Sequence, residues 1–391
     1  MFLSLLPPFR LSLQKAASGR SDLSVLISTL VTVLLLSVGS AQAGFDDRMM
    51  RPAEVIANPE RSLLVDLIGS DERLLAIGER GRVLISDDLG LSWRQGAVPV
   101  SVMLTGIAQA DESSFWVVGH DGIVIRSEDR GENWTKVLEG RKIVELVAEY
   151  YRALVAEAEA DPDYPEFELE ELMFRAEEAE LAVEDQALPT LLNVAFVDAR
   201  HGYLLGAYGL LLETRDGGES WTPINEALGN IDGFHLNALT VTDSALYIAG
   251  EAGSLFRSLD RGQSWEALPS PYDGSFFGLQ PLNQDSLVAY GLRGNAFESR
   301  DGGDSWQPLP LPIKRTLTGM AQLENGTQIL VGSFGALLVK TAGSEQFIPQ
   351  PLPLPAPSMA VLPVTEDQVV VVGLAGVQRV VIKPVAAKAA K

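Results

Sequence analysis

The sequence predicts an all-β fold, a seven-bladed β-propeller with an inserted acidic α-helical hairpin. Three observations carry this prediction. A Gly-x-x-Gly tetrapeptide follows a strand-like run seven times, a motif with Asp and Trp follows five of these tetrapeptides, and the repeat period is about 41 residues. Four short strands in a repeat of that length are typical of a propeller blade.

Composition narrows the function classes. The chain has 391 residues, of which 46% are apolar, enough for a large core. It has no cysteine and three histidines, which excludes disulfides, thiol catalysis and Cys-based zinc sites and disfavours a His-rich metal centre. We therefore expect no metal and no cofactor. A net charge of −22 makes nucleic acid a poor partner.

The first 43 residues have the pattern of a secretory signal peptide. Basic residues precede an uncharged run from Leu23 to Val38, and small residues lead to a cleavage site after Ala43. An uncleaved signal anchor is the alternative. We expect a periplasmic protein without direct bilayer insertion after cleavage, with the propeller at 44–383 and a disordered tail at 384–391.

The repeated turns set the blade count. The second glycines lie at positions 81, 122, 209, 253, 294, 335 and 376, and the one irregular gap, between 122 and 209, is one period plus an insertion. Each blade is expected to run through strands A and B, the Gly-x-x-Gly turn, strand C, a second turn and strand D.

The second turn has the pattern Ser/Thr-x-Asp-x-Gly-x-x-Trp. Its Asp and Trp residues are Asp88 and Trp93, Asp129 and Trp134, Asp216 and Trp221, Asp260 and Trp265, and Asp301 and Trp306. In the sixth repeat the spacing survives while the residues decay, ending at Phe347. Gly supplies a positive φ, Asp accepts hydrogen bonds within the turn, and Trp packs on a neighbouring sheet. Because the carboxylates recur in blade after blade, we interpret them as turn braces and not as catalysts.

These motifs resemble the Asp-box (BNR) repeat, and the whole pattern is similar to the photosystem II stability/assembly factor family over about residues 62–383. The segment 198–203 (Asp-Ala-Arg-His-Gly-Tyr), which leads into the third repeat, is particularly similar. The resemblance implies a seven-bladed propeller in the periplasm or lumen that acts as an assembly chaperone for membrane complexes, without catalysis.

Two features differ from the photosynthetic members: this chain is strongly acidic, and it has a long helical insertion. Similar proteins in non-photosynthetic bacteria tend to accompany large RND-type transporters of the envelope. The resemblance therefore implies a membrane-protein complex or a transporter of the envelope as the partner.

The insertion, residues 137–188, is predicted to form the helical hairpin after blade two. Apolar residues recur at helical spacing on both sides of a break at 161–165. Residues 141–185 contain 15 acidic and four basic residues. The segment is either a solvated charged surface or a docking element. It falls in a strand D to strand A connection, and those connections share one face of a propeller with the Gly-x-x-Gly turns.

Partner contacts are expected on that face, because loops on a rigid scaffold usually carry function. The candidates, aromatic residues mixed with a few polar and cationic ones, are Arg80, His120, Tyr208, His235, Asn237, Phe276, Phe277, Arg293, Arg315 and Phe334. A metal site built on His120 and His235 is rejected for want of further ligands.

A sialidase-like glycoside hydrolase is the alternative function. Arg80, Arg293 and Arg315 supply three arginines for a substrate carboxylate, but the Arg-Ile-Pro segment of sialidases does not precede blade one. We therefore expect a protein that is not an enzyme. Blade seven reaches only its third strand, so residues 53–57 are expected to supply its outer strand, with the opposite sharing as the alternative.

Overall fold

The computed structural model describes residues 48–70 and 72–383. The predicted signal peptide and the predicted C-terminal tail lie outside these residues. Within them, no helix has the length and apolar character needed to cross a membrane.

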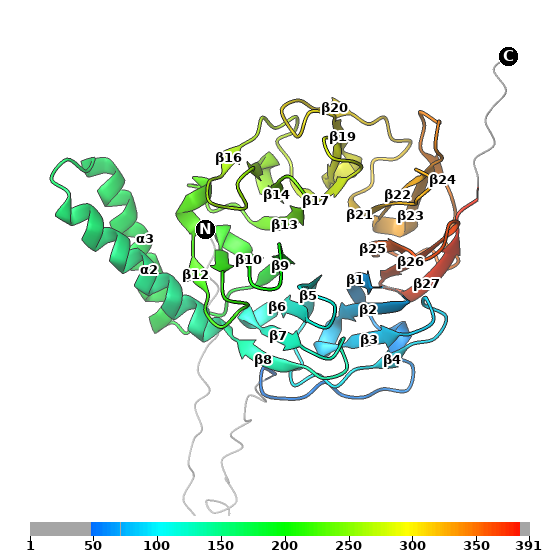
Figure 1. Ribbon diagram of the computed structural model, residues 1–391, viewed down its shortest axis with the longest axis horizontal. Helices are drawn as coiled ribbons and strands as arrows, with labels where there is room; N and C mark the ends of the chain where they lie inside the picture. The colour runs from blue at the N-terminus through cyan, green and yellow to red at the C-terminus, as the bar shows by residue number, and fades with distance from the viewer. Residues whose placement is uncertain (1–47, 71, 384–391) are drawn as a thin grey trace, which may run out of the picture. The chain divides into compact units, whose positions relative to one another are not determined.

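The described chain forms seven antiparallel sheets, six of four strands and one of three, arranged as a β-propeller (Figure 1). The innermost strands are β1 (Leu64–Ser70), β5 (Leu104–Gln109), β9 (Leu191–Phe196), β13 (Leu236–Val241), β17 (Phe276–Pro281), β21 (Leu317–Gln322) and β25 (Ser358–Pro363). The second strands are β2 (Arg73–Gly78), β6 (Phe115–Gly119), β10 (Gly202–Gly206), β14 (Leu246–Gly250), β18 (Leu287–Gly291), β22 (Gln328–Gly332) and β26 (Gln368–Gly373). The third strands are β3 (Val83–Ser86), β7 (Val124–Ser127), β11 (Leu211–Thr214), β15 (Leu255–Ser258), β19 (Ala296–Ser299), β23 (Ala336–Lys340) and β27 (Gly376–Val381). The outer strands are β4 (Arg94–Gln95), β8 (Thr135–Leu138), β12 (Thr222–Pro223), β16 (Glu266–Ala267), β20 (Gln307–Pro308) and β24 (Ile348–Pro349).

The innermost strands contact one another in chain order, and β25 of the last sheet contacts β1 of the first. An apolar cluster joins these two sheets, with Leu67 and Leu74 from blade one beside Val370 and Val372 from blade seven. The succession of blades thus returns to its start through side-chain packing.

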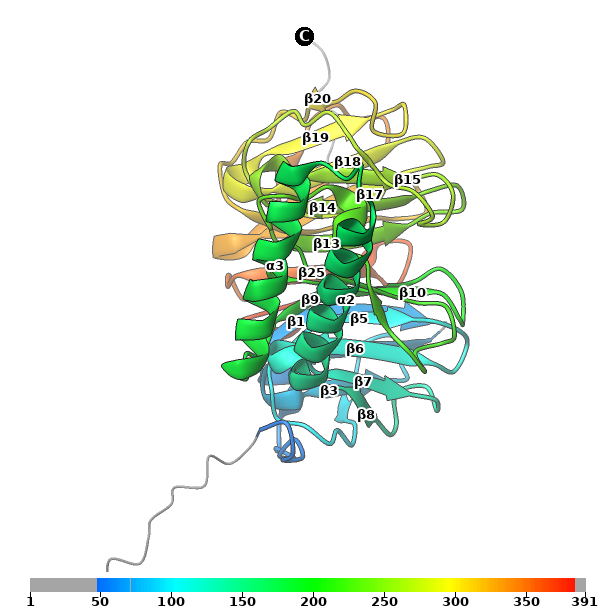
Figure 2. The ribbon, with the colours of Figure 1, turned by 90° about the vertical axis from the view of Figure 1, so that its left-hand side faces the viewer.

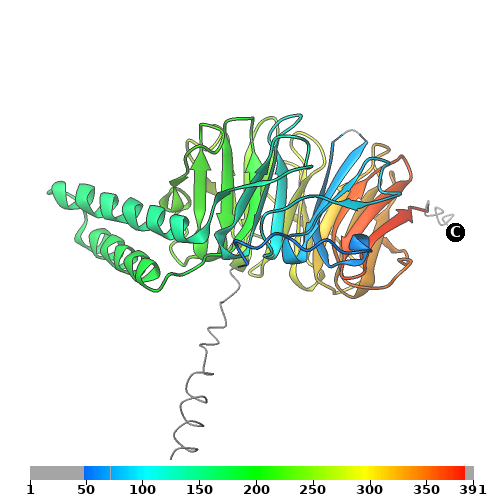
Figure 3. The same ribbon diagram turned by 90° about the horizontal axis from the view of Figure 1, so that it is seen from below.

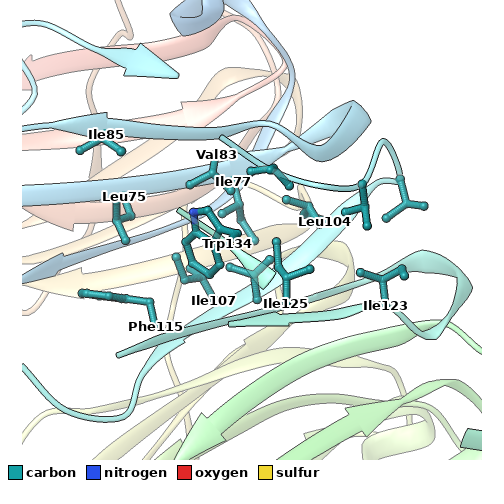
Figure 4. Packing of buried hydrophobic residues seen from close by; sticks show 14 of the residues in the cluster. Leu75, Ile77, Val83, Ile85, Leu104, Ile107, Phe115, Ile123, Ile125 and Trp134 are labelled. Atoms are coloured by element: carbon teal, nitrogen blue, oxygen red, sulfur yellow. The ribbon is translucent and has the colours of Figure 1, made fainter. Parts of the chain in front are cut away.

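Apolar side chains fill the space between neighbouring blades, which is why the second strands read as nearly continuous apolar runs. Five of the seven are buried at every residue. Figure 4 shows the cluster between blades one and two, where Leu75 and Ile77 face Phe115, Ile125 and Trp134. A sheet covered on both faces needs no polar alternation, so burial on both sides explains the pattern.

The five Asp-box turns share hydrogen bonds among the Ser or Thr hydroxyl, the Asp carboxylate and backbone N–H groups, and in the first two repeats the Trp indole adds another; the second repeat shows all of these bonds. The Ser127 hydroxyl donates to Asp129 at 2.9 Å and accepts the N–H of Gly131 at 2.8 Å. The Asn133 N–H donates to Asp129 at 2.9 Å, and the Trp134 indole N–H donates to the Gly131 carbonyl at 2.9 Å. The indole ring then packs against the preceding blade.

The pKa values of these carboxyls are lowered by the same bonds. Hydrogen bonds from the following Ser side chain and N–H lower the pKa of Asp88, Asp216 and Asp260 to about 2. Carboxylates held in this way stay ionised at neutral pH, opposite to what a general acid requires. In the sixth repeat, Phe347 occupies the tryptophan position and is buried.

The expectation for the outer strand of blade seven is wrong. Residues 53–57 form no strand and lie beside blade one, where the Ala53 N–H donates to the Val98 carbonyl and the Gln95 amide donates to the Glu54 carbonyl, both at 3.0 Å. Blade seven keeps three strands. The side-chain amide of Gln378 on β27 exchanges two hydrogen bonds with the backbone of Leu354, so the connection from blade six lies against this strand.

The insertion forms two helices, α2 (Gly140–Ala160) and α3 (Glu166–Glu184), which project beside the ring (Figures 2 and 3). The segment 161–165 between them contains two prolines, which end the first helix. At its base, Ile143 of α2 is fully buried in the core between blades two and three. The hairpin is thus rooted in the propeller and is not a free appendage.

Candidate protein-binding surface

The Gly-x-x-Gly turn of five blades holds one side chain outward, and the first blade shows how. A Cβ on Gly78 would lie 2.1 Å from the Leu63 carbonyl oxygen, and one on Gly81, at φ +71°, would lie 1.9 Å from the Val100 carbonyl oxygen. Both positions therefore need glycine. Between them Arg80 adopts a left-handed conformation, with φ 53°, and its side chain is exposed.

The third residue of this turn is left-handed in six blades. These residues are Arg80, Asp121, Tyr208, Ala252, Arg293 and Phe334, with φ between 50° and 60°. Non-glycine residues rarely take this conformation, so its recurrence at one turn position in six blades indicates that the turn geometry imposes it. All are exposed except Asp121, which is buried under a two-fold ion pair with Arg48 at 2.6 and 2.9 Å.

Tyr208 and Phe334 are the two aromatic residues in this set, and each contacts another of the predicted candidates. The Arg315 guanidinium lies 5.9 Å from the centroid of the Phe334 ring, and it donates to the Phe334 carbonyl at 3.0 Å. The Tyr208 ring lies 4.9 Å from the ring of His235, whose Nδ1 is 2.6 Å from a carboxylate oxygen of Glu251. Tyr208 and Phe334 remain 82% and 75% exposed.

Three candidates do not lie on this surface. Phe276 is fully buried, in ring contact with Tyr272 and Phe297, because the first residue of an innermost strand points between blades. Asn237 and Phe277 follow that position and face the central channel instead, where the Asn237 amide donates to the Phe276 carbonyl at 2.8 Å. His120 and Arg293 are exposed. In the described ranges, no group of three His, Cys, Asp or Glu residues could hold a metal ion.

The sequence did not reveal which residues line the central channel, and Asp66 was not among the candidates. This cavity of about 280 Å³ is lined by the innermost strands of all seven blades. Its one carboxylate is Asp66, and burial raises the pKa of Asp66 to about 6, although two backbone N–H groups oppose this shift. The sequence does contain a signal for Asp66. This residue is the third of its innermost strand, and at the equivalent position five other blades have Gly or Ala and blade three has Asn193.

The sequence reading also left out the place where the hairpin meets the ring. Glu226, in the turn after β12, accepts a hydrogen bond from the Tyr151 hydroxyl of α2 at 2.8 Å and forms an ion pair with Arg175 of α3. A hollow of about 250 Å³ lies between these helices and Tyr208. The helical hairpin and the exposed turns of blade three therefore border one continuous depression.

Comparison with known proteins finds similarity to photosystem II assembly factors. Residues 173–353 match the family model described as Photosynthesis system II assembly factor YCF48. The Photosystem II assembly lipoprotein Ycf48 of Synechococcus sp. (strain CC9902) is 37% identical over 86 residues, which cover 22% of this chain and 25% of that protein. The chloroplastic stability/assembly factor HCF136 of Oryza sativa subsp. japonica is 36% identical over 83 residues, 20% of each chain. The chain thus aligns with only a fifth to a quarter of the length of these relatives.

Solved structures share the fold. The structure of YCF48 bound to D1 peptide has a TM-score of 0.58 at 15% identity and covers 85% of this chain and 97% of its own. YCF48 from Cyanidioschyzon merolae has a TM-score of 0.58 at 13% identity and covers 85% and 99%. The WD40 propeller domain of Doa1 follows at 0.56 with 8% identity, covering 85% and 95%. At such identities the likeness shows the fold alone.

Proposed function

This chain is a member of the photosystem II stability/assembly factor-like family, and from that premise we propose that it is a non-enzymatic periplasmic propeller. In this proposal it binds a membrane-protein complex of the envelope and helps to assemble or stabilise it. The client that we propose is an RND-type transporter, the class that the family resemblance implies for non-photosynthetic bacteria.

One observation carries the binding role. The turns of blades three and six hold Tyr208 and Phe334 in a left-handed conformation with most of each ring exposed. Large aromatic side chains exposed on a rigid turn lose little conformational entropy on binding, and they are common anchors of protein interfaces. The structure of YCF48 bound to D1 peptide supports the proposal, since there a propeller of this fold holds a peptide.

The Asp-box turns support a role without catalysis. The Asp-box carboxylates are engaged within their own turns, and the pKa of several lies far below neutrality. Arg315, one of the arginines that a sialidase would use, is paired with Phe334. Recognition without chemical transformation is the role that such a surface supports best.

Co-purification tests the proposal. The full-length tagged chain is expressed in its source bacterium, the envelope is dissolved in mild detergent, and the recovered membrane proteins are quantified. We expect transporter subunits with the native chain and at least tenfold lower recovery with the double variant Tyr208→Ser/Phe334→Ser. The matched control is Leu91→Ser, because Leu91 is 72% exposed but belongs to an Asp-box turn at the opposite end of the sheets.

Equal recovery with the native chain and the double variant would contradict the binding role. Recovery of some other envelope complex, lost in the double variant, would keep that role and reject the transporter. Release of the fluorophore from a fluorogenic sialoside by the purified chain would contradict the absence of catalysis.

A further inference from the structure

Helix α3 carries two apolar faces. One packs against α2, where Leu172 and Ala179 are buried with Tyr151. The other consists of Phe167, Phe174 and Leu181, which are 69%, 61% and 49% exposed. Residues seven apart lie nearly two turns apart on the same side of a helix, so these three form one exposed stripe. A helix that packs only against α2 needs a single apolar face, so packing within the hairpin does not explain the second one.

The stripe is bordered by carboxylates. Glu170, Glu171, Glu177 and Glu178 lie three or four residues from Phe174, which places them beside it on the helix surface. In the described ranges none of these four forms an ion pair, whereas Glu180 on the same helix pairs with Arg152 at 2.5 Å. No ion pair with another described residue therefore neutralises the negative charge beside the stripe.

The stripe also borders a hollow. A depression of about 380 Å³ is lined by Phe167, Phe174, three of the glutamates and Ile231. Ile231 lies in the loop before β13 and is 66% exposed. The hollow continues into the depression beside Tyr208, because both are lined by Arg175, Glu178 and Ile231. Since Glu226 bonds to both helices, the ring holds this surface in place.

We propose that the stripe, its glutamates and Ile231 form a docking site for a cationic amphipathic helix of a protein partner. Apolar side chains of that helix cover Phe167 and Phe174, and its Lys or Arg residues meet the unpaired glutamates. The stripe runs from residue 167 to residue 181, a rise of about 21 Å along the helix axis, which matches a helix of about four turns. The inference rests on the proposed function in that it adds a second contact to the same class of client.

Charge decides between the possible occupants. A second copy would bring α3 against α3 and set like charges opposite each other in a chain of net charge −22. An anionic lipid surface would repel the glutamates for the same reason. A cationic segment is the occupant that both the apolar stripe and its border favour.

The test uses the chain from residue 44 and three fluorescein-labelled 18-residue peptides, followed by fluorescence anisotropy. The first peptide places Leu on one helical face and Lys on the other; the second scrambles that sequence; the third has Glu in place of Lys. We expect saturable binding of the first peptide alone, weakening as salt rises from 50 to 300 mM. The double variant Phe167→Ser/Phe174→Ser should bind at least tenfold more weakly, and Glu170→Gln/Glu171→Gln/Glu178→Gln should weaken binding and flatten its salt dependence.

Leu91→Ser serves again as the exposed control and should bind like the native chain, and circular dichroism verifies that each variant is folded. Equal binding of the scrambled peptide, or unchanged affinity in both stripe variants, would overturn the proposal. So would a dimer in sedimentation that the Phe167→Ser/Phe174→Ser variant dissociates, or binding to anionic vesicles that it abolishes. Peptide binding is independent of envelope recovery, so a negative result here with intact co-purification would reject the docking site and leave the proposed function standing.

Discussion

Asp66 on β1 accepts a hydrogen bond from the backbone N–H of Ile107 on β5, at 3.2 Å, across the boundary between blades one and two. Asn193 occupies the same register position on β9 and accepts the N–H of Leu239 on β13, also at 3.2 Å. One position of the innermost strand thus joins a blade to its successor in two places. Blade one does this with a carboxylate, and blade three with a neutral amide.

Replacing Asp66 by Asn should stabilise the protein at neutral pH. The pKa of Asp66 is about 6 in the folded protein and ordinarily 3.8, so the folded state holds a proton that the unfolded chain releases. The free energy of unfolding of the native chain therefore falls as pH rises from about 4 to about 6, and the penalty is complete above pH 6. We expect Asp66→Asn to recover up to about 3 kcal/mol at pH 7.5 and little at pH 4, as measured by urea unfolding.

Asp66→Ala removes both the charge and the hydrogen-bond acceptor, whereas Asp66→Asn removes only the charge. Comparing the two variants therefore separates the two effects. Asp66→Ala should gain less than Asp66→Asn at pH 7.5 and should be less stable than the native chain at pH 4, where the native carboxyl is neutral. A gain from Asp66→Asn that does not change between the two pH values would contradict the assignment of the raised pKa.

The Gly-x-x-Gly turn should tolerate no side chain at its second glycine. Gly81 and Gly343 have similar φ angles, +71° and +78°, but an added Cβ would meet the Val100 carbonyl at 1.9 Å in one case and open space in the other. Gly343→Ala should therefore cost about 1 kcal/mol of unfolding free energy from backbone strain alone, and Gly81→Ala about 3 kcal/mol or more. Thermal unfolding measures both; equal costs would show that backbone strain alone requires this glycine.

Trp134 should stabilise the junction of blades one and two. Trp134 is 95% buried, and its indole N–H donates to the Gly131 carbonyl. Trp134→Ala should cost about 3–5 kcal/mol in denaturant unfolding, because it leaves a large cavity between two sheets. Trp134→Phe should cost less than half of that, because blade six already uses Phe347 at the same position. Equal losses for the two variants would mean that ring packing contributes little.

Glu226 should set the rigidity of the hairpin. Glu226→Ala leaves the Tyr151 hydroxyl and Arg175 without their partner, so hydrogen exchange in α3 should accelerate roughly tenfold, equivalent to about 1.4 kcal/mol. The matched control is Glu180→Ala, which breaks the exposed pair with Arg152 within the hairpin and should change exchange much less. Mass spectrometry measures hydrogen exchange in α3 of both variants. Equal exchange rates would show that the ring does not restrain the helical hairpin.

Sequence reasoning reached the repeats because each carries its own local chemistry. The motif residues from Asp88 to Trp306 form turns whose bonds join residues no more than four apart, so spacing alone reveals them. Phe276 shows where such reasoning fails: it and Phe277 are neighbours of the same type, and strand alternation sends one into the core and the other to the channel. Only the register of β17 against β18 decides which.

By itself, the amino-acid sequence determined the repeating strands, the turns and the helical insertion. These depend on glycines, on carboxylates that accept hydrogen bonds within their own turns, and on apolar periodicity over short distances. Tertiary structure alone decided that residues 53–57 lie beside blade one and that blade seven closes against β1 with three strands. It also decided the raised pKa of Asp66 and the meeting of α3 with Ile231. Each of these depends on groups far apart in the chain, and their environment exists only once the ring has assembled.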